Sequence, residues 1–257
     1  MTEDAFAVEI LRIAEAAGRE IMTIYERDFS VTQKEDDSPL TEADMASHHL
    51  ILQELARLDA DYPVLSEEST DITWEDRRHW HRFWLVDPID GTKDFINRTG
   101  EFTVNIALIE DGVPILGVVT APALDLAYWG SRRHGAFRRE KGHKERIHVA
   151  EPPVEKRVVA SKNHMNADTE RFIESLAPYK LVQAGSSLKF CRIAEGSADI
   201  YPRMGPTCEW DTAAAQAVLE AAGGKVETFD EVPLRYNKED VLNPWFIASG
   251  KWYPYHY

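Results

Sequence analysis

An apolar segment that runs straight into two aspartates is the most informative stretch of this sequence. Residues 83–86 (FWLV) have the composition of a buried strand, and Asp87-Pro88-Ile89-Asp90-Gly91-Thr92 follows at once. Two carboxylates three positions apart in a tight turn can point into one small volume, where they repel each other unless a cation neutralises them. Hard oxygen ligands suit Mg²⁺, and Gly91 lets the backbone approach a ligand closely. The same residues also fit an ordinary Asp/Pro/Gly turn, so this segment alone leaves both interpretations open.

Three other acidic segments carry the same ambiguity. Glu67 and Glu68 follow a short strand candidate, and a strand there would point one of them inward. Asp211 opens an alanine-rich helix and fits its N-cap, and the N-terminus of that helix would attract phosphate. The two roles are compatible, because one carboxylate oxygen can serve a metal and the other the helix. Asp44 is the fourth residue of a capping-box sequence. Carboxylates gathered from separate segments around two or more Mg²⁺ ions about 4 Å apart are typical of phosphoryl transfer.

The two halves of the chain differ in their pattern of helices and strands. Apolar residues recur at helical spacing over residues 3–27, and the capping box predicts a second helix over residues 41–58. The turn at residues 111–112 (DG) between two apolar runs is the strongest hairpin signal. Strands and helices then alternate, which is typical of an α/β domain. We expect a domain over residues 1–130 with an antiparallel sheet and most metal ligands, closely packed against a substrate-binding domain over residues 131–257.

Charge and cysteine content exclude several classes of protein. The formal net charge is −15, with the acidic excess in the first half, which argues against a nucleic-acid binder. Only two cysteines occur, Cys191 and Cys208, and no CxxC is present, which favours a reducing, cytoplasmic compartment. No apolar stretch approaches the roughly 20 residues that span a bilayer, although peripheral attachment to the cytoplasmic side of the inner membrane stays open. His48 and His49 lack a metal partner at useful spacing and are expected on a helix surface.

Three motifs in this order resemble a known family. Residues 84–92 (WLVDPIDGT), with Glu67-Glu68 upstream and residues 210–214 (WDTAA) downstream, resemble the inositol monophosphatase superfamily of Mg²⁺-dependent, lithium-sensitive phosphatases. Further segments look like its bacterial 3′(2′),5′-bisphosphate nucleotidase branch: residues 66–68 (SEE), 101–105 (EFTVN), 185–190 (GSSLKF) and 201–203 (YPR). The resemblance implies an α+β or α/β layered sandwich (αβαβα) of the inositol monophosphatase and fructose-1,6-bisphosphatase type. Ala215 departs from the glycine that the family commonly has there, which bears only on how tightly that helix packs.

The resemblance also implies a role for each matching residue. Thr92 and Asp44 would orient and deprotonate the attacking water, with Glu67 also counted as catalytic. The amides of Gly91 and Thr92 would hold the scissile phosphate. Two or three Mg²⁺ ions would be held by four carboxylates and one backbone carbonyl, those of Glu67, Asp87, Asp90, Asp211 and Ile89. The complete set expected to contact substrate is Glu67, Ile89, Asp90, Gly91, Thr92, His164, Gly185, Ser186, Lys189, Arg203 and Asp211.

Substrate choice is expected to come from the second half of the chain. Lys189 and Arg203 would receive a second phosphate, with Ser186 donating a hydrogen bond and His164 beside the nucleoside. Without the resemblance, Lys189 would be a solvated helix lysine and His164 a loop histidine. The expected reaction is hydrolysis of the 3′-phosphate of adenosine 3′,5′-bisphosphate to AMP and phosphate, with the sulfated nucleotide PAPS as a second substrate that gives adenylyl sulfate.

Other functions remain as alternatives. The first is an inositol monophosphatase of broader sugar and polyol phosphate specificity, with fructose 1,6-bisphosphatase behind it. A haloacid dehalogenase-type phosphatase uses Asp-x-Asp, whereas Asp87 and Asp90 are separated by two residues. A non-catalytic anion sensor on the same scaffold would not need every proposed ligand. The sequence predicts a small-molecule substrate rather than a nucleic acid and leaves the oligomeric state open.

Overall fold

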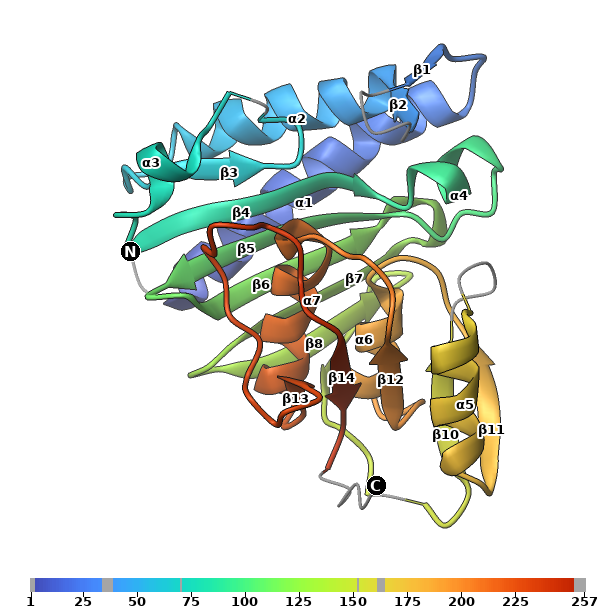
Figure 1. Cartoon of the computed structure of the whole chain (residues 1–257). Coiled ribbons are helices and arrows are strands. Elements are labelled where there is room, and N and C mark those ends of the chain that lie inside the picture. The colour runs from blue at the N-terminus through green and yellow to red at the C-terminus, as the bar shows by residue number, and fades with distance from the viewer. Residues whose placement is uncertain (1–2, 34–38, 70, 152, 161–164, 252–257) are drawn as a thin grey trace.

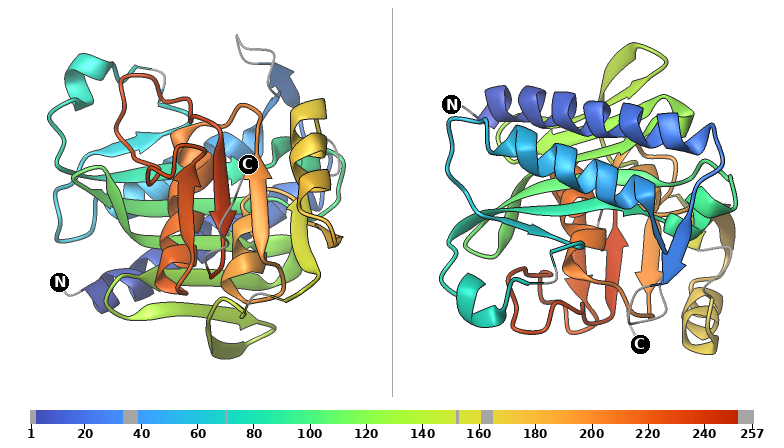
Figure 2. Two further views of the ribbon diagram at one scale, coloured as in Figure 1. Left: turned by 60° about the horizontal axis from the view of Figure 1, so that its bottom comes forward. Right: turned by 90° about the horizontal axis from the view of Figure 1, so that it is seen from above.

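The molecule is built in layers of helices and sheets (Figure 1). The computed structural model describes residues 3–33, 39–69, 71–151, 153–160 and 165–251. Two long helices, α1 (Glu3–Tyr25) and α2 (Glu42–Leu55), lie side by side across one face of a seven-stranded sheet (Figure 2). Between them in sequence is a two-stranded ribbon of β1 (Val31–Gln33) and β2 (Pro39–Thr41).

The seven-stranded sheet has the order β3-β4-β5-β6-β7-β8-β9. Strands β3 and β4 are parallel, and each later neighbouring pair is antiparallel. Short helices α3 (Trp74–Arg77), α4 (Thr92–Ile96) and η1 (Pro122–Leu124) lie in its connections. The strands are β3 (Val64–Ser66), β4 (Arg82–Asp90), β5 (Thr103–Glu110), β6 (Val113–Ala121), β7 (Leu126–Ser131), β8 (Gly135–Glu140) and β9 (His143–Ile147).

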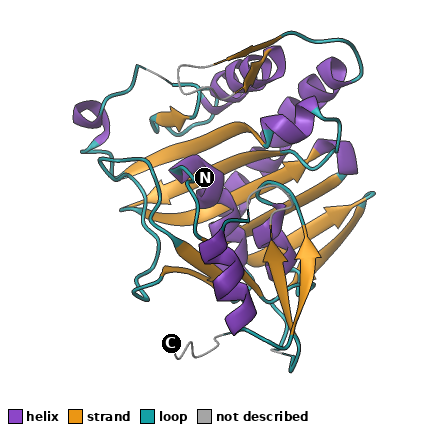
Figure 3. Cartoon of the chain, turned by 45° about the vertical axis from the view of Figure 1, so that its right-hand side comes forward, coloured by secondary structure: helices purple, strands orange, loops and turns teal. Residues whose placement is uncertain are grey.

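A second sheet of five strands has the order β11-β10-β12-β14-β13. Helices α6 (Leu188–Ala194) and α7 (Glu209–Ala221) pack between the two sheets, and α5 (Ala167–Ser175) covers the outer face of the second (Figure 3). This order of layers confirms the predicted αβαβα sandwich. The strands are β10 (Lys156–Ala160), β11 (Tyr179–Gln183), β12 (Ile200–Arg203), β13 (Lys225–Thr228) and β14 (Phe246–Ser249).

Residues 83–86 of β4 are all apolar because helices cover both faces of the sheet. Phe83 and Leu85 belong to the core on the α7 side, whereas Trp84 and Val86 belong to the core under α1 and α2. A strand that is buried on both faces has no polar alternation in its sequence. The side chains therefore alternate strictly between two apolar layers until the strand reaches its aspartates.

The structure differs from expectation at two boundaries. Strand β4 continues through Asp90 instead of ending at residue 86, with an irregular register against β5 between Asp87 and Asp90. The first sheet continues through β9 to Ile147, beyond the expected domain boundary at residue 130, because β8 and β9 extend its antiparallel pairing. Residues 131–147 therefore belong with the first sheet.

Helix α7 packs very closely against the seven-stranded sheet. A Cβ atom on Gly117 of β6 would lie 2.1 Å from the carbonyl oxygen of Ala214, so only glycine fits there. Ala215, which departs from the glycine that the resemblance led us to expect, is 1% exposed and lies within the core. Among the described residues, no helix is long and apolar enough to cross a membrane.

Candidate active site

Because side chains along β4 alternate between the two faces of the sheet, Asp87 points toward the helix layer between the sheets. Asp87 lies two residues beyond Leu85 and therefore points to the same face, where α7 begins. The first turn of α7 supplies Asp211. Ligand-capable oxygens of Asp87, Asp90 and Asp211 all lie within 4.8 Å of one another.

Glu67 joins this group because β3 is the parallel neighbour of β4. Its backbone amide donates to the carbonyl oxygen of Val86 at 3.0 Å, immediately before Asp87. Its carboxylate is near enough for its charge to raise the pKa of both Asp87 and Asp211. The four predicted carboxylates thus meet at one edge of the first sheet.

The carboxylates are poorly accommodated as bare anions. Burial, followed by the charges of Glu67, Asp90 and Asp211, raises the pKa of Asp87 well above its usual value. Burial and the charge of Asp90 raise the pKa of Asp211 to about 8. Asp87 Oδ2 is buried and accepts no hydrogen bond from the residues that the structure describes. Crowded oxygen ligands with an unsatisfied buried atom fit a divalent metal site.

This crowding predicts a characteristic pH dependence for the metal-free protein. Because the pKa of Asp211 is about 8 in the folded state, against 3.8 as its ordinary value, folding favours the protonated form. The contribution of protonated Asp211 to the free energy of unfolding is present at low pH and is lost as pH rises toward 8. In EDTA, Asp211→Asn should therefore gain thermal stability relative to wild type as pH increases from 5 to 8. Melting curves of both proteins across this range test it, and a pH-independent difference would contradict the crowding.

Asp211 is the third residue of α7, not its N-cap as one interpretation had it. The helix begins one turn earlier because Cys208 takes the cap position, with the extended backbone typical of a cap. The carboxylate of Asp211 folds back to accept a hydrogen bond from Cys208 N at 2.7 Å through Oδ2. One oxygen is thereby fixed, and the side chain is held at the carboxylate cluster.

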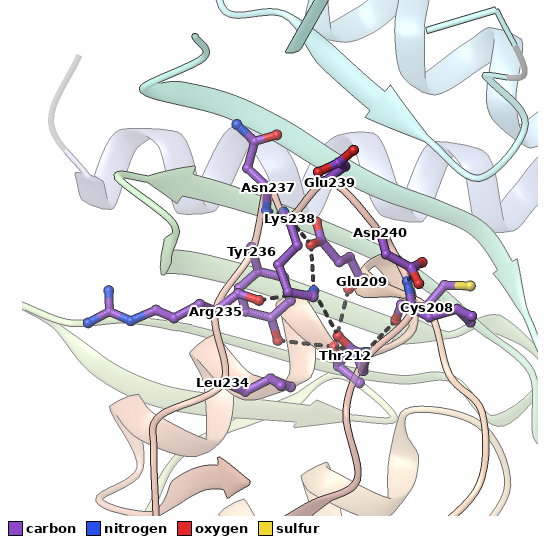
Figure 4. A network of polar contacts seen from close by, with 12 residues as sticks. Cys208, Glu209, Thr212, Leu234, Arg235, Tyr236, Asn237, Lys238, Glu239 and Asp240 are labelled. Carbon is purple, nitrogen blue, oxygen red and sulfur yellow. Dashed lines mark hydrogen bonds and ion pairs between the residues drawn. The ribbon is translucent and has the colours of Figure 1, made fainter. Parts of the chain in front are cut away.

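A polar network holds the start of α7 in place (Figure 4). Glu209 is fully buried and accepts hydrogen bonds from Asn237 N at 2.9 Å, Lys238 N at 2.8 Å and Lys238 Nζ at 2.6 Å. Asn243 Nδ2 donates to the carbonyl oxygen of Cys208 at 2.8 Å. The network ties the loop before β14 to the turn that carries Asp211.

Glu209→Gln should lower the free energy of unfolding by about 3 kcal/mol. The amide group of glutamine would replace a buried carboxylate oxygen with an NH₂ donor, which cannot accept hydrogen bonds from the three donors that now surround the carboxylate. Urea unfolding measures this difference. Glu239→Gln, an exposed glutamate in the same loop, is the matched control and should be close to wild type. Equal stability of the two variants would show that the network does not hold this turn.

Asp44 and Thr92 form a second polar contact beside the cluster. Asp44 is buried, and its Oδ2 accepts from Thr41 N at 2.7 Å and Thr41 Oγ1 at 2.6 Å, so the predicted capping box is present. Its other oxygen, Oδ1, lies 3.3 Å from the donating hydroxyl of Thr92. The carboxylate therefore serves the helix with one oxygen and Thr92 with the other.

Gly91 precedes Thr92 with a left-handed backbone, φ +88°. A Cβ atom there would lie 2.1 Å from Ser186 Oγ, so the position admits only glycine. Ser186 itself directs its hydroxyl to the carbonyl oxygens of Glu101 at 2.7 Å and Asp90 at 2.9 Å. Gly185 is equally confined, because its Cβ would lie 2.8 Å from that of Glu101.

A cavity of about 1000 Å³ opens over these residues. Lys189 lies in its wall with only 8% of its surface exposed, so it is not the solvated helix lysine that the residue type alone suggests. Burial lowers the pKa of Lys189, against the nearby charge of Asp90. Of the predicted site residues, the cavity is lined by Glu67, Asp90, Gly91, Thr92, Gly185, Ser186, Lys189, Arg203 and Asp211.

The remaining predicted residues are placed differently. Asp44, Asp87 and Ile89 are buried beside the cavity, outside its lining. His164 lies outside the described residues. The expectation of a surface position is wrong for His48, which is buried because α2 packs against the first sheet, with Nδ1 2.9 Å from Ser66 Oγ.

Two polar residues beside the cluster had no role in the sequence interpretation. Ser187 and Asn105 are each 1% exposed, and Ser187 Oγ lies 2.7 Å from Asp90 Oδ2. Both belong to segments that carried the resemblance, residues 185–190 and 101–105. A polar residue inside an otherwise apolar strand, such as Asn105 in β5, is the signal that could have found them.

Comparisons with known proteins agree with this geometry. The sequence profile of the inositol monophosphatase family matches residues 3–253. The 3′(2′),5′-bisphosphate nucleotidase CysQ of Escherichia coli K12 is 47% identical over 246 residues, which cover 94% of this chain and 98% of that protein. The crystal structure of CysQ from Bacteroides thetaiotaomicron superposes with a TM-score of 0.87 at 41% identity, covering 97% of this chain and 98% of that one. An inositol monophosphatase from Thermotoga maritima has a TM-score of 0.76 at 27% identity, covering 93% and 89%.

Proposed function

This chain belongs to the inositol monophosphatase family, and on that premise we propose that it is a metal-dependent 3′(2′),5′-bisphosphate nucleotidase. It removes the 3′-phosphate of adenosine 3′,5′-bisphosphate to give AMP and phosphate. The observation that carries the proposal is a single cavity that joins the carboxylate cluster to Lys189 and Arg203. A nucleoside bisphosphate requires carboxylates that hold metal ions at the phosphate to be cleaved. It also requires basic side chains that bind its second phosphate.

The proposed cofactor is Mg²⁺, with two or three ions per site. The carboxylates of Glu67, Asp87, Asp90 and Asp211, with the carbonyl oxygen of Ile89, would hold them. Bound Mg²⁺ would neutralise phosphate oxygens and make an attacking water more acidic. The unsatisfied Asp87 Oδ2 and the raised pKa of Asp211 support this donor set.

Gly91 and Thr92, where β4 passes into α4, act with Asp44 of α2 on the scissile phosphate and its attacking water. The Thr92 hydroxyl donates to Asp44 and so has a lone pair free to orient the water, whose proton passes toward the Asp44 carboxylate. The amides of Gly91 and Thr92 hold the phosphate oxygens. Gly91 can do so because it lacks the Cβ that Ser186 would exclude.

Lys189 and Arg203 bind the phosphate that is not cleaved. Arg203 Nε is buried without a hydrogen-bond partner among the described residues, and Arg203 Nη2 donates to the carbonyl oxygen of Pro206 at 2.9 Å. Lys189→Gln should lower kcat/KM for adenosine 3′,5′-bisphosphate by about 10- to 100-fold, the loss of a charged hydrogen bond. Activity on p-nitrophenyl phosphate, which lacks the second phosphate, should change little. Equal losses on both substrates would count against this assignment.

A panel of phosphate esters tests the substrate. We expect phosphate release from adenosine 3′,5′-bisphosphate and PAPS to exceed that from inositol 1-phosphate and fructose 1,6-bisphosphate, and Li⁺ to inhibit it. Faster hydrolysis of inositol 1-phosphate would favour a broader inositol monophosphatase-type enzyme. A trapped aspartyl-phosphate at Asp87 would show the haloacid dehalogenase mechanism, and binding without turnover would show an anion sensor.

The proposed setting is the cytoplasm, where such an enzyme would act in sulfur metabolism on the by-products of sulfated nucleotides. Low cysteine content supports this location. His164 remains the proposed neighbour of the nucleoside.

A further inference from the structure

Ser187 stands at the N-cap of α6, yet its side chain does not cap that helix. Serine at this position usually accepts a hydrogen bond from the first turn. Here Ser187 Oγ lies instead 2.7 Å from Asp90 Oδ2 and 2.9 Å from the carbonyl oxygen of Asp211. One hydroxyl of the second half thus contacts two of the three segments that bring ligand carboxylates to the cluster.

Asn105 determines how that hydroxyl can be used. Its Nδ2 donates to Ser187 Oγ at 2.7 Å, and its amide lies near enough to the Asp90 carboxylate to lower the pKa of that carboxyl. With a lone pair of Oγ occupied by this donor, the single proton of the hydroxyl is directed to Asp90 or to the Asp211 carbonyl. The ionised carboxylate is the stronger acceptor of the two.

Asn105 is a buried polar residue in a mostly apolar strand. It lies within β5, paired with Asp87 in a fully buried stretch, and its Oδ1 has no hydrogen-bond partner among the described residues. A buried amide with an unsatisfied carbonyl is costly. What this amide provides in return for that cost is its hydrogen bond to Ser187 Oγ.

We propose that Ser187 and Asn105 are a pair of positioning residues that fix the Asp90 carboxylate for metal binding. The Ser187 hydroxyl, itself held by Asn105, donates to Asp90 Oδ2, which leaves the other carboxylate oxygen for a cation at the cluster. Ser187 Oγ also lies 2.9 Å from the carbonyl oxygen of Asp211, so the hydroxyl stands between the β4 and α7 ligands. The inference rests on the proposed metal-dependent function and adds two residues to its machinery.

Metal binding can be measured without turnover. Mn²⁺, which prefers the same oxygen ligands as Mg²⁺, is titrated into metal-stripped protein, and its free concentration is followed by electron paramagnetic resonance. Ser187→Ala should weaken Mn²⁺ binding by about 10- to 100-fold, the usual effect of removing a group that orients a ligand. The Mg²⁺ concentration for half-maximal activity should rise in parallel, with little change in KM at saturating Mg²⁺.

Two further variants separate positioning from general damage. Thr120→Val removes a hydroxyl that is as buried but has no hydrogen-bond partner among the described residues, and it should bind Mn²⁺ like wild type. Asn105→Leu should weaken binding in the same direction as Ser187→Ala. The double variant should be little worse than Ser187→Ala alone, because the two residues act as a unit.

Wild-type affinity in Ser187→Ala, or an equal loss in Thr120→Val, would overturn the positioning role. If the wild type binds Mn²⁺ and Ser187→Ala weakens it, but adenosine 3′,5′-bisphosphate is not hydrolysed, the pair stands and the proposed function fails. A wild type that binds no Mn²⁺ overturns both.

Discussion

Asp90→Asn should reduce phosphate release from adenosine 3′,5′-bisphosphate by about a thousandfold at saturating Mg²⁺, a loss of about 4 kcal/mol of transition-state stabilisation. The substitution replaces an anionic ligand with a neutral amide at the centre of a cluster spanning no more than 4.8 Å between ligand-capable oxygens. The fold should survive. The amide oxygen can still accept the hydroxyl of Ser187, and one of the mutually repelling charges is gone.

Steady-state kinetics and a melting curve in EDTA measure both parts of this expectation. The thermal midpoint of metal-free Asp90→Asn should equal or exceed that of wild type. Asp125→Asn removes an acid from a left-handed turn far in sequence from the cluster, a conformation that asparagine tolerates, and serves as the control. Retention of activity in Asp90→Asn would show that the carboxylate cluster is not the site of catalysis.

Thr92→Val should lower kcat by about a hundredfold while Mn²⁺ binding stays unchanged, because the hydroxyl orients water and is not a proposed metal ligand. Valine keeps the branched shape at Cβ and removes the hydroxyl that lies 3.3 Å from Asp44 Oδ1. Thr92→Ser keeps the hydroxyl and should restore most of the rate.

This pattern distinguishes a water-orienting role from a structural one. A loss shared by Thr92→Val and Thr92→Ser would point to the methyl group and to packing. A loss of Mn²⁺ binding in Thr92→Val would place the hydroxyl among the metal ligands. Both results are incompatible with the proposed contact between Thr92, Asp44 and the attacking water.

Local sequence patterns predicted the elements whose causes are local. The predicted capping box between Thr41 and Asp44 is present in the structure, because its donors and acceptors lie within one helical turn. The hairpin of β5 and β6 forms around the turn at residues 111–112 for the same reason. Helix α7 was placed correctly, but its start shifted because Cys208 takes the cap position, and a cysteine there is an uncommon signal.

Contacts between distant segments were beyond the reach of such patterns. Ser187 reaches Asp90 across 97 positions, and Glu209 reaches Lys238 across 29. Neither residue has a local feature that separates it from an ordinary N-cap serine or surface glutamate. The burial of Lys189 could not be predicted for the same reason. The groups that cover its side chain belong to the second sheet and to the carboxylate cluster, not to its own helix. The carboxylates themselves were predictable because two strand ends and one helix start each carry them.

The most direct measurement is a chromatographic analysis of products from metal-stripped protein and adenosine 3′,5′-bisphosphate, before and after Mg²⁺ is added. We expect no turnover in EDTA, and stoichiometric inorganic phosphate and 5′-AMP once Mg²⁺ is present. Phosphate release that persists in EDTA, or a product that keeps its 3′-phosphate, would contradict the account.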